Sequence, residues 1–193
     1  MKLRLAVALA LVVFAIAGCS RNTPEAAPAP VASNNDADAA ARARADSIAA
    51  AELARRQAEE RALQQQMARA QEILSSVVLF AYDSDELDPE AEERLRTKAA
   101  ILRANPTLEL RVEGHADERG STEYNLALGQ RRAESIRSFL AGYGITENRL
   151  ATISYGKERP TVMGSSESAW RQNRRGEFAV TAGEISAIPP EVR

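Results

Sequence analysis

The clearest pattern of hydrophobic and polar positions lies over residues 107–113, where the two kinds alternate strictly. Leu108, Leu110 and Val112 fall on one side, and charged residues occupy the other. Because side chains of a strand point alternately to its two faces, this pattern predicts a half-buried strand. Short runs rich in β-branched and aromatic residues predict three more strands, at 77–82, 150–155 and 177–181.

Apolar residues spaced by three and four positions predict two main helices between these strands. The first is expected to begin at Asp88-Pro89, an N-cap and first-turn pair, and to end before Asn105-Pro106. The second is expected over 122–141, with a buried stripe made of Leu126, Gly129, Ala133, Ile136 and Leu140. A short helix around 166–172 precedes the last strand.

The order of these elements, β-α-β-α-β-(α)-β, predicts the fold class. It is typical of an α/β two-layer sandwich in which two main helices cover one face of a small sheet. This domain is expected to span residues 76–182, with a C-terminal tail at 183–193.

The chain that precedes this domain has a different composition. Residues 37–75 contain no Gly or Pro and are rich in Ala, Arg, Glu and Gln, so they predict a helical spacer. An apolar stripe occupies only the last third of this spacer, which leaves a single helix and a coiled coil both open. Residues 19–36 hold almost no large apolar side chains after the cysteine and predict a flexible leash.

The N-terminus has the features of a cleaved leader. Lys2 and Arg4 precede an apolar run from Leu5 to Ile16, and small residues follow. This run is too short to cross a bilayer, which takes roughly 20 apolar residues, so residues 1–18 are expected to be a signal peptide.

The leader ends in a specific motif, Ile16-Ala17-Gly18-Cys19. It resembles the lipobox of bacterial lipoproteins, which implies that Cys19 is acylated and becomes the new N-terminus. An ordinary secretory leader with an incidental cysteine is the alternative. Ser20 follows the cysteine where an aspartate would resemble a signal for retention at the inner membrane, so we expect a lipid anchor in the outer membrane, on its periplasmic face.

Charge and composition exclude several classes of function. The chain has 25 basic and 27 acidic residues, so it lacks the basic excess of a nucleic-acid-binding protein. One cysteine and one histidine cannot form a disulfide or a Cys/His zinc cluster, and no metal or cofactor is expected. Since Cys19 is expected to carry lipid, no nucleophilic cysteine remains, and we do not expect an enzyme.

The loop between the second strand and the second main helix brings opposite charges together. Asp117 lies in this loop and Arg132 lies on the helix that follows, so a carboxylate and a guanidinium can face one cleft. Such a cleft suits a small zwitterion, because a guanidinium takes a carboxylate through two parallel hydrogen bonds and an aspartate accepts from an ammonium group. The alternative is that the two side chains pair with each other or cap the helix.

Three motifs in this region occur in a recognisable order. They are Gly114-His115-Ala116-Asp117-Glu118-Arg119-Gly120-Ser121, then Tyr124-Asn125-Leu126-Ala127-Leu128-Gly129-Gln130-Arg131-Arg132-Ala133, and finally Asn173-Arg174-Arg175. Together they resemble the signature of the OmpA-like peptidoglycan-binding domain family, and in particular the peptidoglycan-associated lipoproteins of the Tol-Pal system. The resemblance extends from about Val77 to Val180.

This resemblance implies a ligand for the charged pair. Asp117 and Arg132 would hold the ammonium and carboxylate end of meso-diaminopimelate in the stem peptide of peptidoglycan. Neighbouring residues are expected to complete the site, namely Gly114, His115, Gly120, Asn125, Leu128, Asn173 and Arg174. For His115, a role in stabilising the loop is the alternative.

These inferences predict a binding protein without catalytic activity. It would be an outer-membrane lipoprotein that binds peptidoglycan non-covalently and tethers the membrane to the cell wall, with TolB and other Tol-Pal components as partners. The alternative is an OmpA-family lipoprotein that acts mainly as a periplasmic protein-interaction module.

Overall fold

A four-stranded mixed sheet forms the centre of the domain. The computed structural model describes residues 34–192 of the chain. The strands are β1 (Val78–Leu79), β2 (Glu109–His115), β3 (Leu150–Gly156) and β4 (Arg175–Ala182). They lie in the order β1-β4-β2-β3, with β2 parallel to β3 and β4 antiparallel to both of its neighbours.

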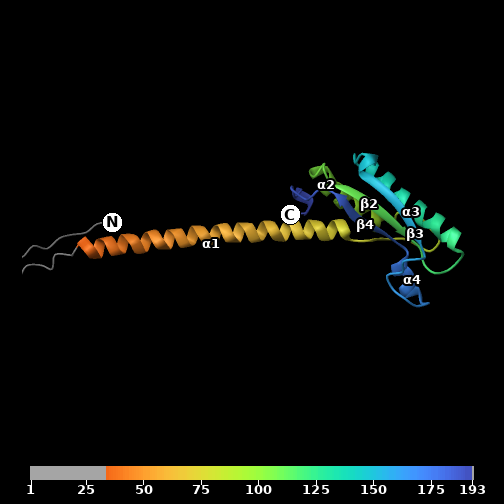
Figure 1. The fold of residues 1–193 in the computed structure, drawn as a ribbon, viewed down its shortest axis with the longest axis horizontal. Coiled ribbons are helices and arrows are strands. Elements are labelled where there is room, and N and C mark those ends of the chain that lie inside the picture. Colours follow the sequence, from red (N-terminus) through yellow and green to blue (C-terminus); the bar gives the residue numbers. More distant parts are fainter. Residues whose placement is uncertain (1–33, 193) are drawn as a thin grey trace, which may run out of the picture. The chain divides into compact units, whose positions relative to one another are not determined.

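Two main helices, α2 (Pro89–Ala104) and α3 (Thr122–Gly142), pack on one face of this sheet (Figure 1). The remaining elements are short: η1 (Glu147–Arg149), α4 (Glu167–Asn173) and η2 (Pro190–Val192). Leu110 and Val112 of β2, and Leu108 just before the strand, are fully buried in the core with the helices. The predicted α/β two-layer sandwich and the predicted alternation in β2 are confirmed.

Local sequence signals account for where the main helices begin and end. The Asp88 side chain accepts a hydrogen bond from the Ala91 N–H at 2.7 Å, and Ser121 accepts from the Tyr124 N–H at 3.2 Å. N-caps of this kind stabilise a helix by about 1 kcal/mol each. At the other end of α2, the buried Asn105 side chain donates to the Ile101 carbonyl at 2.9 Å and ends the helix.

The buried stripe of α3 differs from the predicted one at its N-terminal end. Gly129, Ala133, Ile136 and Leu140 are buried as expected, but Leu126 is 38% exposed. The stripe extends back instead through residues 125 and 128. Leu126 lies at its margin, about 60° around the helix from Gly129 at 3.6 residues per turn.

The first strand is shorter than predicted. Residues 77–82 favour a strand, yet only Val78 and Leu79 pair with β4. After Phe80 the chain turns, because Asp83 adopts the left-handed conformation with φ 53°. The backbone carbonyls of Ala81 and Ser84 in this turn accept hydrogen bonds from the buried guanidinium of Arg132 rather than from a neighbouring strand.

A long helix, α1 (Asn34–Ser75), precedes the sheet, as predicted. It begins before residue 37, so residues 34–36 of the predicted leash are helical.

The described chain forms two units, residues 34–49 and 50–192. The first unit is helical, and its side chains are exposed. In the second, α1 is mainly exposed until Ala70 and Leu74 enter the core. No helix within residues 34–192 is long and apolar enough to cross a membrane.

Lys98 of α2 fastens the C-terminal end of α1 to the domain. Its side chain has no exposed surface, and its ammonium group donates to the carbonyls of Ile73, Leu74 (2.9 Å) and Ser76 (2.7 Å). It also lies 4.2 Å from the centre of the Phe178 ring. Burial lowers the pKa of Lys98 to about 7, whereas the carbonyls at a helix C-terminus favour the charged form.

Candidate functional site

A cleft of about 100 Å³ opens where β2 ends and α3 begins. Its lining consists of Tyr82, Asp83, Asp117, Arg119, Gly120, Tyr124, Asn125, Leu128 and Arg132. The structure therefore brings together Asp117 and Arg132 with three of the other predicted site residues, Gly120, Asn125 and Leu128. Gly114, His115, Asn173 and Arg174 do not line this cleft.

Asp117 lies just beyond the end of β2 and is only 5% exposed. Arg119 holds both of its oxygens, with Nε 3.0 Å from Oδ1 and Nη2 2.6 Å from Oδ2. Arg174 adds a weaker contact, Nη1 to Oδ2 at 3.4 Å. Burial raises the pKa of Asp117, but the hydrogen bonds from these arginines outweigh it and leave the pKa below its usual value. The carboxylate is therefore ionised at neutral pH, and its ion pairs go to Arg119 and Arg174 rather than to Arg132.

Four lining residues were not predicted as site residues, namely Tyr82, Asp83, Arg119 and Tyr124, and Arg119 is the one that contacts Asp117. Its guanidinium lies between the rings of Tyr82 and Trp170, 4.1 Å from the centre of each. Stacking on two aromatic faces and a bidentate bond to Asp117 fix its position. Its spacing of two residues from Asp117 was the available signal, but several other arginines in the motifs were equally plausible partners.

Arg132 lies at the floor of the cleft with no exposed surface. Its guanidinium donates to three backbone carbonyls: Nε to Ser84 at 2.8 Å, Nη1 to His115 at 2.7 Å, and Nη2 to Ala81 at 3.1 Å. These bonds join the end of β2 to the loop after β1. Burial, with the charge of Arg174 next, lowers the pKa of Arg132 to about 10, so it keeps its charge at neutral pH.

The bonds of Arg132 leave part of its guanidinium uncommitted. An arginine has five N–H donors, and the three bonds within residues 34–192 use Nε, one N–H of Nη1 and one of Nη2. One N–H therefore remains on each terminal nitrogen. These two N–H groups have no partner among the described residues and can donate to an anion such as a carboxylate.

The rim of the cleft is held by local bonds. Gly120 has φ 87°, a conformation that favours glycine, and it turns the loop toward α3. Asn125 donates from Nδ2 to the Arg119 carbonyl at 2.8 Å and so holds the loop backbone. The neighbouring Tyr124 hydroxyl donates to Asp83 of the loop after β1. Leu128, 4% exposed, forms an apolar part of the wall.

Two of the predicted residues outside the cleft belong to β2. A Cβ atom at Gly114 would lie 1.8 Å from the Gly129 carbonyl oxygen, so this glycine lets α3 approach the sheet. The His115 carbonyl accepts from Arg132, while its ring is buried beside the ring of Tyr155, at 5.5 Å between ring centres.

The other two predicted residues outside the cleft end α4. The Asn173 side chain accepts from the backbone N–H groups of Thr161 (2.8 Å) and Val162 (3.1 Å), which fixes the loop after β3. Arg174 is buried behind Asp117, and it also bonds Glu167 at 2.8 Å and the Phe80 carbonyl at 3.2 Å. Direct ligand contacts by these residues stay predictions.

One spacing in the chain resembles that of a catalytic pair. Ser154 and Lys157 form a Ser-x-x-Lys sequence, the spacing of the nucleophile and lysine in penicillin-binding enzymes. Here Ser154 lies in strand β3, so the two side chains are not one helical turn apart. The Lys157 ammonium instead donates to the Gly120 carbonyl at 2.8 Å.

Comparison with known proteins identifies the family of the domain that holds this cleft. The model of the OmpA family matches residues 79–174. The peptidoglycan-associated lipoprotein of Haemophilus influenzae is 44% identical over 104 residues, which are 54% of this chain and 68% of that protein. The chain belongs to the OmpA family, among its peptidoglycan-associated lipoproteins. The family resemblance inferred from the motifs is thus confirmed.

Further relatives place the match in the sheet domain. The peptidoglycan-associated lipoprotein of Brucella melitensis is 48% identical over 98 residues, but the match covers only 58% of that protein and 51% of this chain. The crystal structure of the peptidoglycan-associated lipoprotein from Burkholderia pseudomallei superposes with a TM-score of 0.53 at 37% identity, over 54% of this chain and 89% of that one. The family is non-enzymatic, in agreement with the expectation from sequence.

Proposed function

We propose that this chain is an outer-membrane lipoprotein that binds peptidoglycan non-covalently through the diaminopimelate of its stem peptides. The supporting observation is that the cleft contains both an ionised carboxylate, Asp117, and a charged guanidinium with two unused N–H groups, Arg132. The free end of diaminopimelate carries an ammonium and a carboxylate. The cleft offers one group of opposite charge to each.

Binding in this cleft requires the rim to rearrange. Arg119 already occupies both oxygens of Asp117, so a ligand ammonium competes with its guanidinium. Arg132 has no exposed surface, so a ligand carboxylate reaches it only after a rim side chain moves. Tyr82 is 62% exposed and stacks on Arg119, so these two side chains are the ones that we expect to move together.

The ligand role of Asp117 is tested by co-sedimentation with purified diaminopimelate-type peptidoglycan. The protein is the full chain with Cys19→Ser, and the variant is Asp117→Asn, which keeps the shape but loses the charge. A charge-assisted hydrogen bond is worth about 1.5–3 kcal/mol, so we expect binding to weaken by about tenfold or more. Glu158→Gln is the matched control, because Glu158 is an exposed carboxylate in the loop after β3 and lies outside the cleft.

Two outcomes would refute this assignment. A parent protein that does not sediment with peptidoglycan would refute the function. Equal sedimentation of the parent and Asp117→Asn would show that the ligand binds elsewhere on the domain.

The proposal extends to the anchor and the partners. Cys19 lies outside the described residues, and its acylation follows from the lipobox resemblance and from the lipoprotein relatives. We expect Cys19→Ser to abolish palmitate labelling and outer-membrane fractionation of the chain. Under the same proposal, the protein acts in the Tol-Pal system and binds TolB, which a pull-down with purified TolB tests directly.

A further inference from the structure

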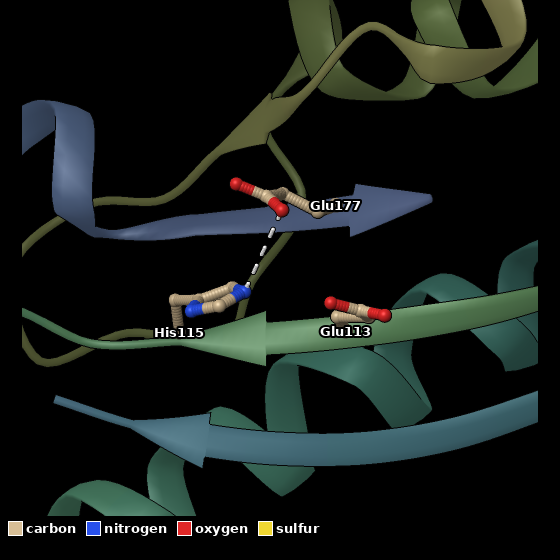
Figure 2. A group of neighbouring side chains, drawn as sticks. All are labelled: Glu113, His115 and Glu177. Carbon is tan, nitrogen blue, oxygen red and sulfur yellow. Dashed lines mark ion pairs between the residues drawn. The ribbon is translucent and has the colours of Figure 1, made fainter. Parts of the chain in front are cut away.

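A second polar cluster lies on the other face of the sheet, outside the cleft. Glu113 and His115 of β2 point away from α3, and Glu177 of β4 lies beside them (Figure 2). Glu113 and Glu177 are directly paired in the antiparallel register of β2 and β4. One ligand atom from each of the three residues lies within 4.8 Å of the other two.

The His115 ring lacks partners that a buried imidazole needs. The residue is 1% exposed, and neither ring nitrogen has a hydrogen bond within residues 34–192. An unsatisfied buried polar group costs about 1–3 kcal/mol, so such a group calls for a partner. Nε2 faces Glu177, whose nearer oxygen is 4.0 Å away, too far for a hydrogen bond (Figure 2).

Arginines hold the two glutamates in place by one oxygen each. Arg111 donates to Oε1 of Glu113 at 2.6 and 2.8 Å, and Arg175 donates to Oε1 of Glu177 at 2.5 Å. Hydrogen bonds among residues 34–192 leave Oε2 of both glutamates without a donor. Carboxylates oriented in this way by a neighbouring donor are common around bound metal ions.

From this geometry we propose that Glu113, His115 and Glu177 form a binding site for a divalent transition-metal ion such as Zn²⁺. One imidazole nitrogen and two carboxylate oxygens are a donor set that Zn²⁺ accepts, and a fourth position stays open to solvent on the side of Glu177. Metal bonds of 2.0–2.2 Å place tetrahedral ligands about 3.4 Å apart. Small rotations of the Glu113 and Glu177 side chains would bring the three ligand atoms from their present separation, within 4.8 Å, to this distance.

The charges around the cluster set its affinity. The two carboxylates balance the charge of a divalent ion, but Arg111, Arg159 and Arg175 add positive charge nearby. We therefore expect a weaker site than the closed zinc sites of structural domains. Burial, with the charge of Arg175 next, lowers the pKa of His115 to about 4, so the ring is neutral at pH 7 and has a lone pair for a metal.

The site is tested with Zn²⁺ and the full chain carrying Cys19→Ser, so that the one thiol cannot contribute. Calorimetric titration should show saturable one-to-one binding at micromolar Zn²⁺. The chain has a single histidine, so a nitrogen-15 spectrum of imidazole groups contains one ring, and Zn²⁺ should shift its Nε2 signal. Mg²⁺, which prefers oxygen ligands, should leave that signal unchanged.

Variants separate this site from other surface carboxylates. Glu177→Gln keeps an acceptor for Arg175 but loses the anionic ligand, and we expect Zn²⁺ to bind at least about tenfold more weakly. Glu113→Gln should act in the same way. Glu109→Gln is the matched control, because Glu109 is an exposed carboxylate of the same strand and lies outside the cluster.

Three results would overturn the proposal. The first is no saturable binding of Zn²⁺ by the parent chain. The second is binding that leaves the His115 ring signals in place, which would locate the ion at surface carboxylates. The third is equal affinity in the parent and in both cluster variants. None of these results decides whether Asp117 and Arg132 bind peptidoglycan, because neither residue belongs to the cluster.

Discussion

Replacing Arg132 by alanine should destabilise the domain as well as affect its cleft. The guanidinium is fully buried and satisfies the carbonyls of Ala81, Ser84 and His115. Removing it leaves those three acceptors in a space that water enters poorly. At about 1 kcal/mol for each carbonyl, the expected loss is on the order of 3 kcal/mol. This is a large part of the roughly 5–15 kcal/mol that stabilises a typical domain.

Urea denaturation, followed by circular dichroism, measures this loss. With a slope of about 1.5–2 kcal/mol per molar urea, Arg132→Ala should lower the midpoint by about 1.5–2 M. Arg131→Ala is the matched control: the neighbouring arginine is exposed, and its nearest carboxylate oxygen, on Asp85, is 3.9 Å away. It should change stability by less than about 0.5 kcal/mol.

A midpoint for Arg132→Ala within the error of the control would refute the reasoning. It would show that water replaces the guanidinium without cost, so Arg132 would not join β2 to the loop after β1. The expected result has a practical consequence. Arg132→Ala is a poor probe of ligand binding, because weaker binding by an unstable variant does not identify a ligand contact.

Three further predictions follow from the contacts of single side chains. A soluble stem peptide with lysine in place of diaminopimelate lacks the carboxylate proposed to bind Arg132. Calorimetry should show that it binds the chain about 30-fold more weakly than the diaminopimelate peptide, a difference of roughly 2 kcal/mol in binding free energy. Equal affinities of the two peptides would contradict the assignment. Folding lowers the pKa of His115 from 6.5 to about 4, so the unfolded chain binds more protons than the folded chain between these pH values. With a chelator present, the free energy of unfolding should therefore fall by up to about 3 kcal/mol as the pH drops from 6.5 to 4. His115→Gln should flatten that slope, and an unchanged slope would assign it to other groups. Lys98→Met should cost roughly 1–3 kcal/mol in urea denaturation because the carbonyls at the end of α1 lose their donor, whereas Arg103→Met on the exposed side of α2 should be neutral.

The parts of the fold that the sequence predicted are those specified by local signals. Asp88-Pro89 and Asn105 mark the ends of α2 in the chain itself, and the structure has the helix within those limits. The alternation over 107–113 is likewise a property of neighbouring residues. Leu126 shows the limit of this reasoning, because it has helical spacing with the buried stripe and is still 38% exposed.

The composition of the candidate cleft was predictable in part, but the pairing of its charged side chains was not. The motifs placed Asp117 and Arg132 near one cleft, and both line it. Which arginine contacts Asp117 depends on side-chain geometry that no spacing encodes, and Arg119 takes that position because two aromatic rings hold it there.

The cluster of Glu113, His115 and Glu177 was hidden for a different reason. Two of its members are two residues apart, but the third comes from a strand more than sixty positions later. Only the register of β2 with β4 makes Glu113 and Glu177 neighbours. A search for cysteine and histidine spacings could not find such a set, because the antiparallel pairing creates it.

The contact between Lys98 and the end of α1 has a mechanical meaning if the chain tethers two layers of the cell envelope. Tension between a membrane anchor and a wall-bound domain would enter the domain where α1 joins it. At that junction, Ala70 and Leu74 are embedded in the core, and one ammonium group holds carbonyls from the last turn of the helix and from Ser76. Because one ammonium group makes all of these bonds, separating the end of α1 from Lys98 would break them together. If the chain is such a tether, the resistance of this junction to force would depend on Lys98, a residue that does not line the cleft.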